Sequence, residues 1–419
     1  MDIIDDLTWR GLIQDSTDPE ALREAVDAGG LSFYVGFDPT AESLHVGHLT
    51  QVLTARRLQA AGLRPHLLVG GATGQIGDPR QTSERNLNSP ETVAGWVKKI
   101  QGQIEPFLDF EGSDAAVMVN NLDWTSGMDV ISFLRDVGKH FSVSKMINRE
   151  VVRARLETGI SFTEFSYQLL QSNDYYQLNE RYGVSLQFGG SDQWGNITAG
   201  VDFVRRSNGK HVHAFVTPLV LKADGTKFGK TAGGGNTWLS SELTSPYAFY
   251  QFWINADDRD VAKYLRYFSF KSREEIEELE EATREKPAAR LAQRALAEEL
   301  TTLLHGAEEC ADVQAASKAL FGRGELAELP EPTLRSALAE AGLAEAGAET
   351  TVAQMFKDAG VVGSLGEARR AAKEGGVYVN NERVTEVNEP IASEKLLHGR
   401  YAVLRRGKKT VAGAEVTSR

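Results

Sequence analysis

The feature that most constrains the fold is an alternation of short apolar runs with stretches of helical periodicity. Apolar runs occur at 31–37, 67–69, 115–120 and 184–188, and apolar residues at helical spacing first appear between them at 43–61. A short run of β-branched, aromatic and aliphatic residues that a turn closes is typical of a buried strand. Strands that alternate with helices predict a parallel sheet. We therefore expect an α/β domain that binds its ligands at the carboxyl ends of the strands.

Turn-forming residues follow three of these runs. Asp38-Pro39 follows the first run, the glycine-rich stretch 70–77 follows the second, and Gly189-Gly190 follows the fourth. Backbone of this kind can approach a ligand closely. The stretch 70–77 does not have the Gly-x-Gly-x-x-Gly pattern, so a dinucleotide-binding fingerprint is not indicated.

The rest of the chain suggests further modules. Between the third and fourth runs, 124–182 has an almost wholly helical pattern and is predicted to be an insertion into the sheet domain. We expect the following organisation: a Rossmann-like catalytic domain at 1–240, an α-helical domain at 241–322, a linker at 323–350, and a small α+β domain at 351–419.

The charge is unevenly distributed. The 419 residues carry a net charge of −12, which argues against nucleic acid as a partner of the chain as a whole. Residues 351–419, however, contain 12 lysines and arginines against 8 acidic residues. This excess is either ordinary scatter or the mark of a basic module that binds nucleic acid.

Several classes of protein are disfavoured by the composition. Cys310 is the one cysteine, so an intramolecular disulfide and a cysteine-built zinc site are excluded. No run approaches the roughly 18 apolar residues of a membrane span. Residues 1–20 are acidic, unlike an export signal. We expect a cytoplasmic protein without a membrane partner.

Two histidines mark the first candidate site. His45 and His48 are three residues apart, so they share a face in the first turn of the helix that follows the first strand. Backbone N–H groups at a helix N-terminus favour anions, and an imidazole can donate a hydrogen bond to a phosphate oxygen. Two surface histidines or a metal pair are the alternatives. The spacing is not His-Glu-x-x-His, which makes zinc the weaker choice.

The segment Lys227-Phe228-Gly229-Lys230-Thr231 is the second candidate. It contains Gly-Lys-Thr, but only three residues separate Gly225 from Gly229, and a P-loop needs four. The segment is therefore either a lysine-bearing loop that can close on phosphates or a plain solvated loop.

Polar residues on two further segments complete the list. Asp192 follows Gly189-Gly190 and can bind a ribose hydroxyl, although aspartate is also common in turns. Tyr167, Gln171 and Asp174 lie on one face of a helix, which is either a solvated face or the wall of a pocket.

Together these residues resemble one family. His45-Val46-Gly47-His48 resembles the His-Ile-Gly-His signature of class I aminoacyl-tRNA synthetases, and 227–231 resembles their Lys-Met-Ser-Lys-Ser loop. Within that class, the similarity to bacterial tyrosyl-tRNA synthetases runs over about residues 1–320, and is carried by 34–40, 69–79, 189–200 and 222–231.

The resemblance implies a tyrosine–tRNA ligase, which forms tyrosyl-adenylate and pyrophosphate from L-tyrosine and ATP and then charges tRNA(Tyr). At the amino-acid end it implies that Tyr34 and Asp174 bind the phenol hydroxyl, that Asp78, Tyr167 and Gln171 bind the α-amino group, and that Gln193 lies near the carboxylate. It places Gly36, Asp38, Gly190 and Asp192 at the amino acid or the adenosine. It places Thr40, His45 and His48 at ATP, and Lys227, Lys230 and Thr231 at the pyrophosphate.

The resemblance also implies a homodimer formed by the helical insertion. Mg²⁺ is expected to arrive with ATP, without a dedicated protein site. In one respect the chain departs from the family, because the loop 80–85 has no lysine. A phosphate contact expected there falls to Arg80 or Arg85, or is absent.

The C-terminal region has a resemblance of its own. Residues 364–380 resemble the S4 RNA-binding fold, and Arg369, Arg370 and Lys373 can present three cations to an RNA backbone. Two alternatives to the tyrosine enzyme remain open: the sister tryptophanyl enzyme, and a synthetase-like protein that binds structured RNA without ligase activity. Tyr34 and Asp174 favour a phenol over an indole. The intact His45 and His48 argue against a degenerate site.

Overall fold

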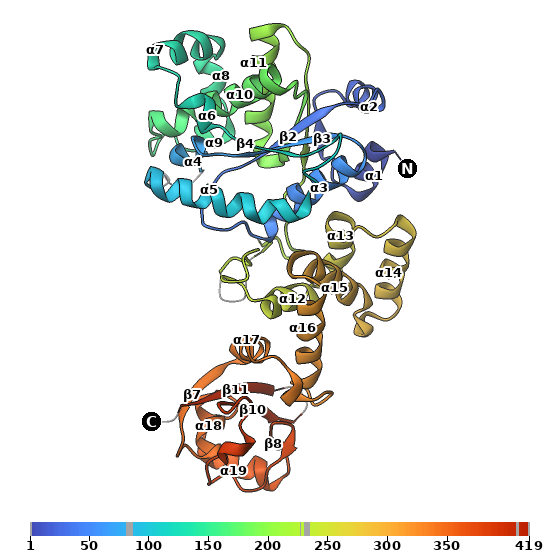
Figure 1. Ribbon diagram of the computed structural model, residues 1–419, viewed down its shortest axis with the longest axis vertical. Helices are drawn as coiled ribbons and strands as arrows, with labels where there is room; N and C mark the ends of the chain where they lie inside the picture. The colour runs from blue at the N-terminus through green and yellow to red at the C-terminus, as the bar shows by residue number, and fades with distance from the viewer. Residues whose placement is uncertain (1, 81–86, 227, 230–234, 408–409, 418–419) are drawn as a thin grey trace. The chain divides into compact units, whose positions relative to one another are not determined.

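The computed structural model describes residues 2–80, 87–226, 228–229, 235–407 and 410–417 (Figure 1). The chain forms two compact units. The first consists of Met1–Ser240 and Arg259–Glu277, and the second of Ser241–Asp258 and Glu278–Arg419.

A six-stranded sheet organises the first unit. Its strands are β1 (Asp15–Ser16), β2 (Ser32–Phe37), β3 (Arg64–Val69), β4 (Val117–Asn120), β5 (Leu186–Gly190) and β6 (His213–Thr217). Their order across the sheet is β1-β6-β5-β2-β3-β4. Strands β2 to β6 are parallel, and the short β1 runs antiparallel to β6. The predicted Rossmann-like parallel sheet is thus confirmed, and the four apolar runs correspond to β2, β3, β4 and β5.

Strand order reverses at β2, and this reversal determines where a ligand can bind. The chain proceeds from β2 outward to β3 and β4, then returns to the other side of β2 as β5. The connections after β2 and β5 therefore leave the sheet in opposite directions, which opens a crevice at the carboxyl ends of these strands. Phe37 and Gly190 end these two strands.

Helices cover both faces of this sheet. Figure 1 shows α3 (Leu49–Ala60) and α5 (Pro90–Ile104) on one side and α10 (Phe162–Tyr182) and α11 (Trp194–Asn208) on the other. Shorter helices complete the unit: α1 (Ile3–Arg10), α2 (Pro19–Asp27), α4 (Thr73–Ile76) and α13 (Asp258–Phe268). The inward faces are strongly apolar, and β2, β3 and β5 are almost fully buried.

The predicted helical insertion is present between β4 and β5. It contains the short helices α6 (Leu122–Thr125), α7 (Val130–Ser132), α8 (Val143–Ile147) and α9 (Glu150–Arg153) before the long α10. Helix α10 begins after Ser161, whose hydroxyl accepts a hydrogen bond from the Glu164 backbone N–H at 3.2 Å. It ends at Gly183, which has the left-handed φ of 69° typical of a helix C-cap.

The second unit combines helices with a small sheet. Its helices are α12 (Pro246–Ile254), α15 (Leu291–His305), α16 (Ala307–Ala319), α17 (Glu331–Ala341), α18 (Val352–Asp358) and α19 (Leu365–Lys373), and α14 (Arg273–Glu285) crosses the boundary between the units. The five strands are β7 (Leu343–Gly347), β8 (Val377–Val379), β9 (Glu382–Arg383), β10 (Tyr401–Arg406) and β11 (Thr410–Thr417), in the order β7-β11-β10-β8-β9.

The range 323–350, expected to be a linker, contains α17 and also β7. Strand β7 pairs in parallel with β11, far away in the sequence. Its sequence, Leu-Ala-Glu-Ala-Gly, has little intrinsic preference for a strand, so the local pattern gives no sign of this pairing. Among the described residues no helix has the length and apolar character to cross a bilayer.

Candidate active site

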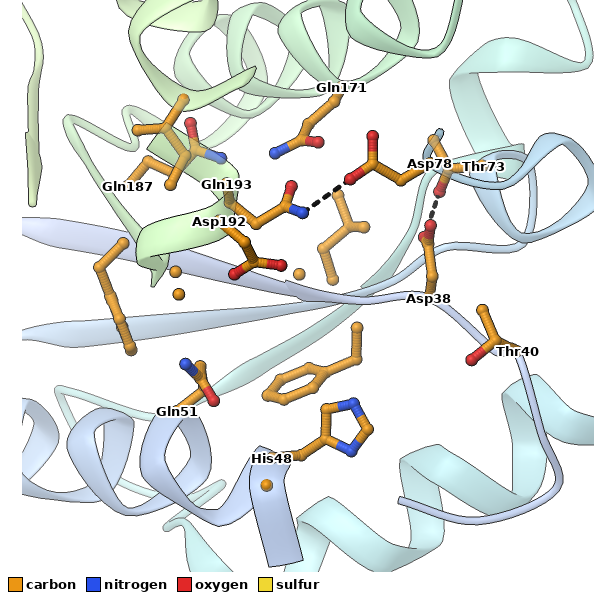
Figure 2. Close-up of a pocket in the computed structure, with 18 of the residues that line it drawn as sticks. Asp38, Thr40, His48, Gln51, Thr73, Asp78, Gln171, Gln187, Asp192 and Gln193 are labelled. Carbon is orange, nitrogen blue, oxygen red and sulfur yellow. Dashed lines mark hydrogen bonds between the residues drawn. The ribbon is translucent and has the colours of Figure 1, made fainter. Parts of the chain in front are cut away.

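A cavity of about 490 Å³ lies at the crevice beside β2 and β5 (Figure 2). Every described residue of the first unit that the sequence nominated lines it: Tyr34, Gly36, Asp38, Thr40, His45, His48, Asp78, Arg80, Tyr167, Gln171, Asp174, Gly190, Asp192 and Gln193. Lys227, Lys230, Thr231 and Arg85 lie outside the described residues. Arg369, Arg370 and Lys373 lie on α19 in the second unit.

Figure 2 shows that the polar groups occupy two sides of the cavity. Asp78, Gln171 and Gln193 lie on one side of the strand ends. His48 and Gln51 lie on the other side. This arrangement can receive a ligand with two chemically different ends.

The two histidines stack on each other and are held by backbone hydrogen bonds. Their rings stack with centroids 4.0 Å apart. The His45 backbone N–H donates to His48 Nδ1, and the Gly47 backbone N–H donates to His45 Nδ1, both at 3.1 Å. Burial, and then the neighbouring His45, lower the pKa of His48 from 6.5 to about 3. Because Nδ1 accepts, the ring proton of His48 resides on Nε2, which is a donor suited to a phosphate or sugar oxygen.

Asp174 forms the floor of the cavity on the α10 side. Its carboxylate accepts hydrogen bonds from Trp124 Nε1 at 2.8 Å and Asn121 Nδ2 at 3.0 Å. Burial raises its pKa from 3.8 to about 7, although the two hydrogen bonds oppose this rise. The carboxylate thus keeps accepting capacity for a hydroxyl of the ligand.

Tyr34 lines the same cavity as Asp174 and contributes a buried hydroxyl. Its side chain is 1% exposed, and its hydroxyl has no hydrogen-bond partner among the described residues. Burial, and then the charge of Asp174, raise the pKa of Tyr34 well above its usual value, so the hydroxyl stays protonated. A buried polar group without a partner points to a ligand group that satisfies it. A ligand hydroxyl can accept from Tyr34 and donate to Asp174.

Asp78 and Gln171 form a second polar region. Gln193 Nε2 donates to Asp78 Oδ2 at 2.8 Å, and Asn196 Nδ2 donates to Asp78 Oδ1 at 3.2 Å. Burial raises the pKa of Asp78, against these two hydrogen bonds. The Gln171 Oε1 atom is buried and has no partner in the described part of the chain. A carboxylate beside an unsatisfied amide oxygen suits an ammonium group.

Asp38 is held by two hydroxyl groups. Tyr167 donates its phenolic proton to Asp38 Oδ2, and Thr73 donates to Asp38 Oδ1, both at 2.6 Å. Asn121 Nδ2 in turn donates to Thr73 Oγ1 at 2.9 Å. One network therefore connects Asp38, at the carboxyl end of β2, with Asp174 on the floor of the cavity.

Several residues of the site were not nominated from the sequence. Thr73, Asn121 and Trp124 hold the carboxylates, while Gln51 and Gln187 line the cavity. Asn121 carried a usable signal, because it directly follows an apolar run predicted to end at this edge. Trp124 carried none, since its role depends on a contact with α10 across the cavity floor.

Phe228 and Gly229, the described residues of the second signature segment, lie close to the first. Phe228 lines the cavity and packs on Tyr264 and Phe268, with ring centroids 5.0 and 5.5 Å apart. Gly229 has a φ of 83°, and a Cβ atom there would lie 2.8 Å from Val46 Cγ2. Only a residue without a side chain can make this approach in this conformation.

Backbone hydrogen bonds connect the same segments. The Thr237 N–H donates to Gly229 O at 2.8 Å, and the Val46 N–H donates to Thr237 O at 2.9 Å. The Leu239 N–H donates to Leu44 O at 2.8 Å. These bonds fix the described ends of the lysine-bearing segment to the histidine-bearing one.

Comparisons with known proteins agree with this geometry. A family model described as "tRNA synthetases class I (W and Y)" matches residues 27–322, and one described as "Tyrosine--tRNA ligase SYY-like C-terminal domain" matches 337–412. The tyrosine–tRNA ligase of Streptomyces coelicolor is 63% identical over 419 residues, with 99% of each chain covered. That of Corynebacterium glutamicum is 54% identical over 420 residues, with 99% of this chain and 100% of the relative covered.

Solved structures show the same fold. A C-terminally truncated mitochondrial tyrosyl-tRNA synthetase of Aspergillus nidulans has a TM-score of 0.69 and 29% identity, and the match covers 76% of this chain and 94% of that one. The tryptophanyl-tRNA synthetase of Plasmodium falciparum has a TM-score of 0.54 at 13% identity, covering 79% and 87%, which shows the fold alone.

Proposed function

The chain belongs to the tyrosine–tRNA ligase family of class I synthetases, and on this premise we propose that it activates L-tyrosine with ATP and charges tRNA(Tyr). The buried Tyr34 hydroxyl facing the Asp174 carboxylate carries the choice of amino acid. A ligand without a hydroxyl leaves both groups unpaired in a buried site, and an unpaired buried polar group costs about 1–3 kcal/mol. This difference favours tyrosine over phenylalanine.

In the first step the carboxylate of tyrosine attacks the α-phosphorus of ATP. The new bond joins a carboxylate oxygen to this phosphorus, the bond to the bridging oxygen of the β-phosphate breaks, and pyrophosphate leaves. The protein need not supply a nucleophile, so catalysis consists of positioning and of stabilising developing charge. Asp78 and Gln171 would hold the ammonium group, while His48 Nε2–H and the Thr40 hydroxyl would donate to oxygens of ATP.

We assign the remaining nominated residues in the same way. Tyr167 acts with Asp78 and Gln171 at the ammonium group, and Gln193 lies beside the reacting carboxylate. Gly36, Asp38, Gly190 and Asp192 border the amino acid and the adenosine. His45, Lys227, Lys230 and Thr231 serve the phosphates and the departing pyrophosphate.

ATP is proposed to enter as its magnesium complex. Within the described residues there is no group of three or more histidine, cysteine or acidic side chains arranged to hold a metal ion. We propose that the phosphate oxygens of ATP hold the ion, which neutralises part of their negative charge.

In the second step a hydroxyl of the tRNA 3′ nucleotide attacks the tyrosyl carbonyl, and AMP leaves. We assign RNA binding to α19 in the S4-like region. Ala368, Ala371 and Ala372 are buried, so Arg369, Arg370 and Lys373 lie on the exposed face of this helix. Such a row of cations suits a phosphate backbone.

A second copy of the chain is the proposed partner of the helical insertion. Six large apolar side chains of this region are between 49% and 73% exposed: Val130, Ile131, Leu134, Val143, Leu156 and Phe162. Large contiguous apolar patches are rare on monomeric proteins, so six such side chains in one region support an interface here. A homodimer that charges tRNA also agrees with a cytoplasmic location, where the buried Cys310 thiol would stay reduced.

Pyrophosphate exchange into ATP, measured with each amino acid in turn, tests the activation step. We expect exchange with tyrosine and little with tryptophan or phenylalanine. Exchange driven by tryptophan would support the sister enzyme, and RNA binding without exchange would support a non-catalytic role. For the second step, replacing Arg369, Arg370 and Lys373 by glutamine should leave exchange unchanged and weaken tRNA charging. Equal charging would contradict the RNA-binding assignment.

A further inference from the structure

We propose that Asp260, in the first turn of α13, is a positioning residue for the lysine-bearing segment 227–231. It acts through the backbone of Ala223, which precedes this segment, and touches no substrate. This inference rests on the proposed function, because it concerns how Lys227 comes to the phosphates during the activation of tyrosine.

A tight turn leads into the lysine-bearing segment. The Gly225 N–H donates to Lys222 O at 2.9 Å, and the Lys222 N–H donates to Thr226 O at 3.0 Å. Asp224 Oδ1 accepts hydrogen bonds from the Thr226 backbone N–H at 2.9 Å and from the Thr226 hydroxyl at 2.6 Å. These bonds hold the turn together, so a contact made by one of its residues orients the whole turn, including Thr226 directly before Lys227.

Asp260 makes such a contact. Its Oδ2 atom accepts a hydrogen bond from the Ala223 N–H at 2.9 Å, and its Oδ1 atom accepts one from Lys263 Nζ at 3.2 Å. Lys263 Nζ also donates to the Leu221 carbonyl oxygen at 2.6 Å. One carboxylate and its ion-pair partner therefore hold the backbone on both sides of Lys222.

The burial of Asp260 indicates that this contact is specific. Asp260 is 3% exposed, whereas Ala223 and the three residues that follow it are exposed. Removing a carboxylate from water is unfavourable unless hydrogen bonds and an opposite charge compensate for it. An acid in the first turn of a helix is stabilised by the helix dipole without being buried. The dipole alone therefore does not account for a buried carboxylate that accepts a hydrogen bond from the turn.

The same helix also holds the residue that follows Lys227. Phe228 is 8% exposed and packs on the rings of Tyr264 and Phe268 of α13. Contacts with α13 thus flank Lys227 on both sides in the sequence, at Ala223 and at Phe228.

Helix α13 is in turn fixed to the part of the unit that carries the histidines. Beyond the end of the helix, Arg57 Nη2 donates to Ser269 O at 2.6 Å, and Arg10 Nη1 donates to the same oxygen at 2.9 Å. Both arginines are buried, and cations at the C-terminal carbonyl groups of a helix are favourable. Arg57 belongs to α3, which begins directly after His48. Helix α13 therefore sets the lysine-bearing segment relative to the helix that follows the histidines.

Two substitutions remove the hydrogen bond from opposite sides in the full-length protein. Asp260→Ala removes the acceptor. Ala223→Pro removes the donor, and proline is favoured at the second position of a turn, which Ala223 occupies. Asp260→Asn keeps an acceptor oxygen, and Ala223→Ser keeps the N–H group. Asp18→Asn, at the aspartate that caps α2, is the matched control.

Tyrosine-dependent pyrophosphate exchange is the readout, and urea denaturation verifies that each variant is folded. We expect Asp260→Ala and Ala223→Pro each to lower kcat about tenfold, because a displaced lysine is most costly when charge develops on the departing pyrophosphate. KM for tyrosine should change less than about twofold, since this loss concerns the transition state. The two changes together should be no slower than either alone. The two conservative variants should stay within about threefold of the wild type, and the control should match it.

A second cycle, in a Lys227→Gln background, separates positioning from a general structural effect. With the flanked cation absent, Asp260→Ala should lower kcat less than about twofold further. A full tenfold loss in this background would overturn the positioning role, as would a rise in KM for tyrosine as large as the fall in kcat.

Exchange at the wild-type rate in Ala223→Pro would also overturn the inference, and this variant decides the question alone if Asp260→Ala does not fold. All these outcomes leave tyrosine-dependent exchange by the wild type intact. Its absence in the wild type would instead refute the proposed function and this inference with it.

Discussion

Replacing Asp174 by asparagine should weaken tyrosine activation and at the same time remove a source of instability. The substitution preserves the shape of the side chain and deletes its charge. A hydrogen bond to a charged group contributes about 1.5–3 kcal/mol, so kcat/KM for tyrosine should fall between about tenfold and somewhat over 100-fold. Phenylalanine has no hydroxyl that can donate a hydrogen bond to Asp174, so the slow pyrophosphate exchange that it supports should change little.

The same substitution should stabilise the folded protein at high pH, although it weakens activity. The pKa of Asp174 is about 7 in the folded protein, against an ordinary value of 3.8. This difference corresponds to about 4 kcal/mol of destabilisation once both states are ionised. The unfolded chain loses its proton first, so the penalty grows as pH rises from about 4 and is complete above about 7. Asparagine carries no charge and therefore no such penalty. Its amide N–H group would, however, face the Asn121 Nδ2 donor in place of an acceptor, and the lost hydrogen bond lowers stability by about 1–3 kcal/mol.

Denaturation of both proteins by urea at pH 8 and at pH 5 measures this effect. Relative to the wild type, the variant should lose about 2–3 kcal/mol of stability between pH 8 and pH 5. Glu24→Gln, at an exposed acid of α2, is the control for both measurements. An equal fall in exchange with tyrosine and with phenylalanine would refute the phenol-binding assignment. A stability difference that does not depend on pH would refute the buried charge.

Three further perturbations test other parts of the site. His48 has a pKa of about 3 and stays neutral above pH 5, so kcat for exchange should depend on pH in the same way in the wild type and in His48→Gln. An inflection near pH 6.5 that is present in the wild type and absent from the variant would contradict this. Gly229→Ala should reduce exchange and should lower the free energy of unfolding by about 1–3 kcal/mol in urea denaturation. Adding Val46→Ala to this variant should restore part of both losses. Unchanged values in Gly229→Ala would show that the close approach is not needed. Phe162→Glu should convert the proposed dimer to a monomer in sedimentation experiments, whereas Phe110→Glu, outside the insertion, should not. A dimer that persists in the first variant would place the interface elsewhere.

Much of the catalytic unit could be predicted because its signals are local. Strands β2 and β5 are apolar runs that end in Asp38-Pro39 and in glycines, and their carboxyl ends must meet at one edge of a parallel sheet. The spacing of Tyr167, Gln171 and Asp174 placed them on one helix face, and the cavity shows that this face lines a pocket.

Other features depend on partners that a local pattern does not contain. Trp124 looks like any apolar residue of a short helix until its indole N–H meets Asp174 across the cavity floor. The buried Arg155 and Glu164 read as two ordinary charges of a helical segment. Strand β7 has weak strand propensity and is stabilised by its pairing with β11.

The backbone pairing of Leu44–Val46 with Thr237–Leu239 has a consequence for how the protein reaches its active form. Four of the six strands, β3 to β6, lie between these two segments in the sequence, so the loop that their contact closes is among the long ones of the catalytic unit. Contacts of such high sequence separation form slowly, because much chain entropy is lost before they stabilise anything. Helices such as α10 can form from local contacts within microseconds, well before the two signature segments meet. On refolding, enzyme activity should therefore return later than helicity, and the gap between the two signals measures how late the end proposed to bind the phosphates is assembled.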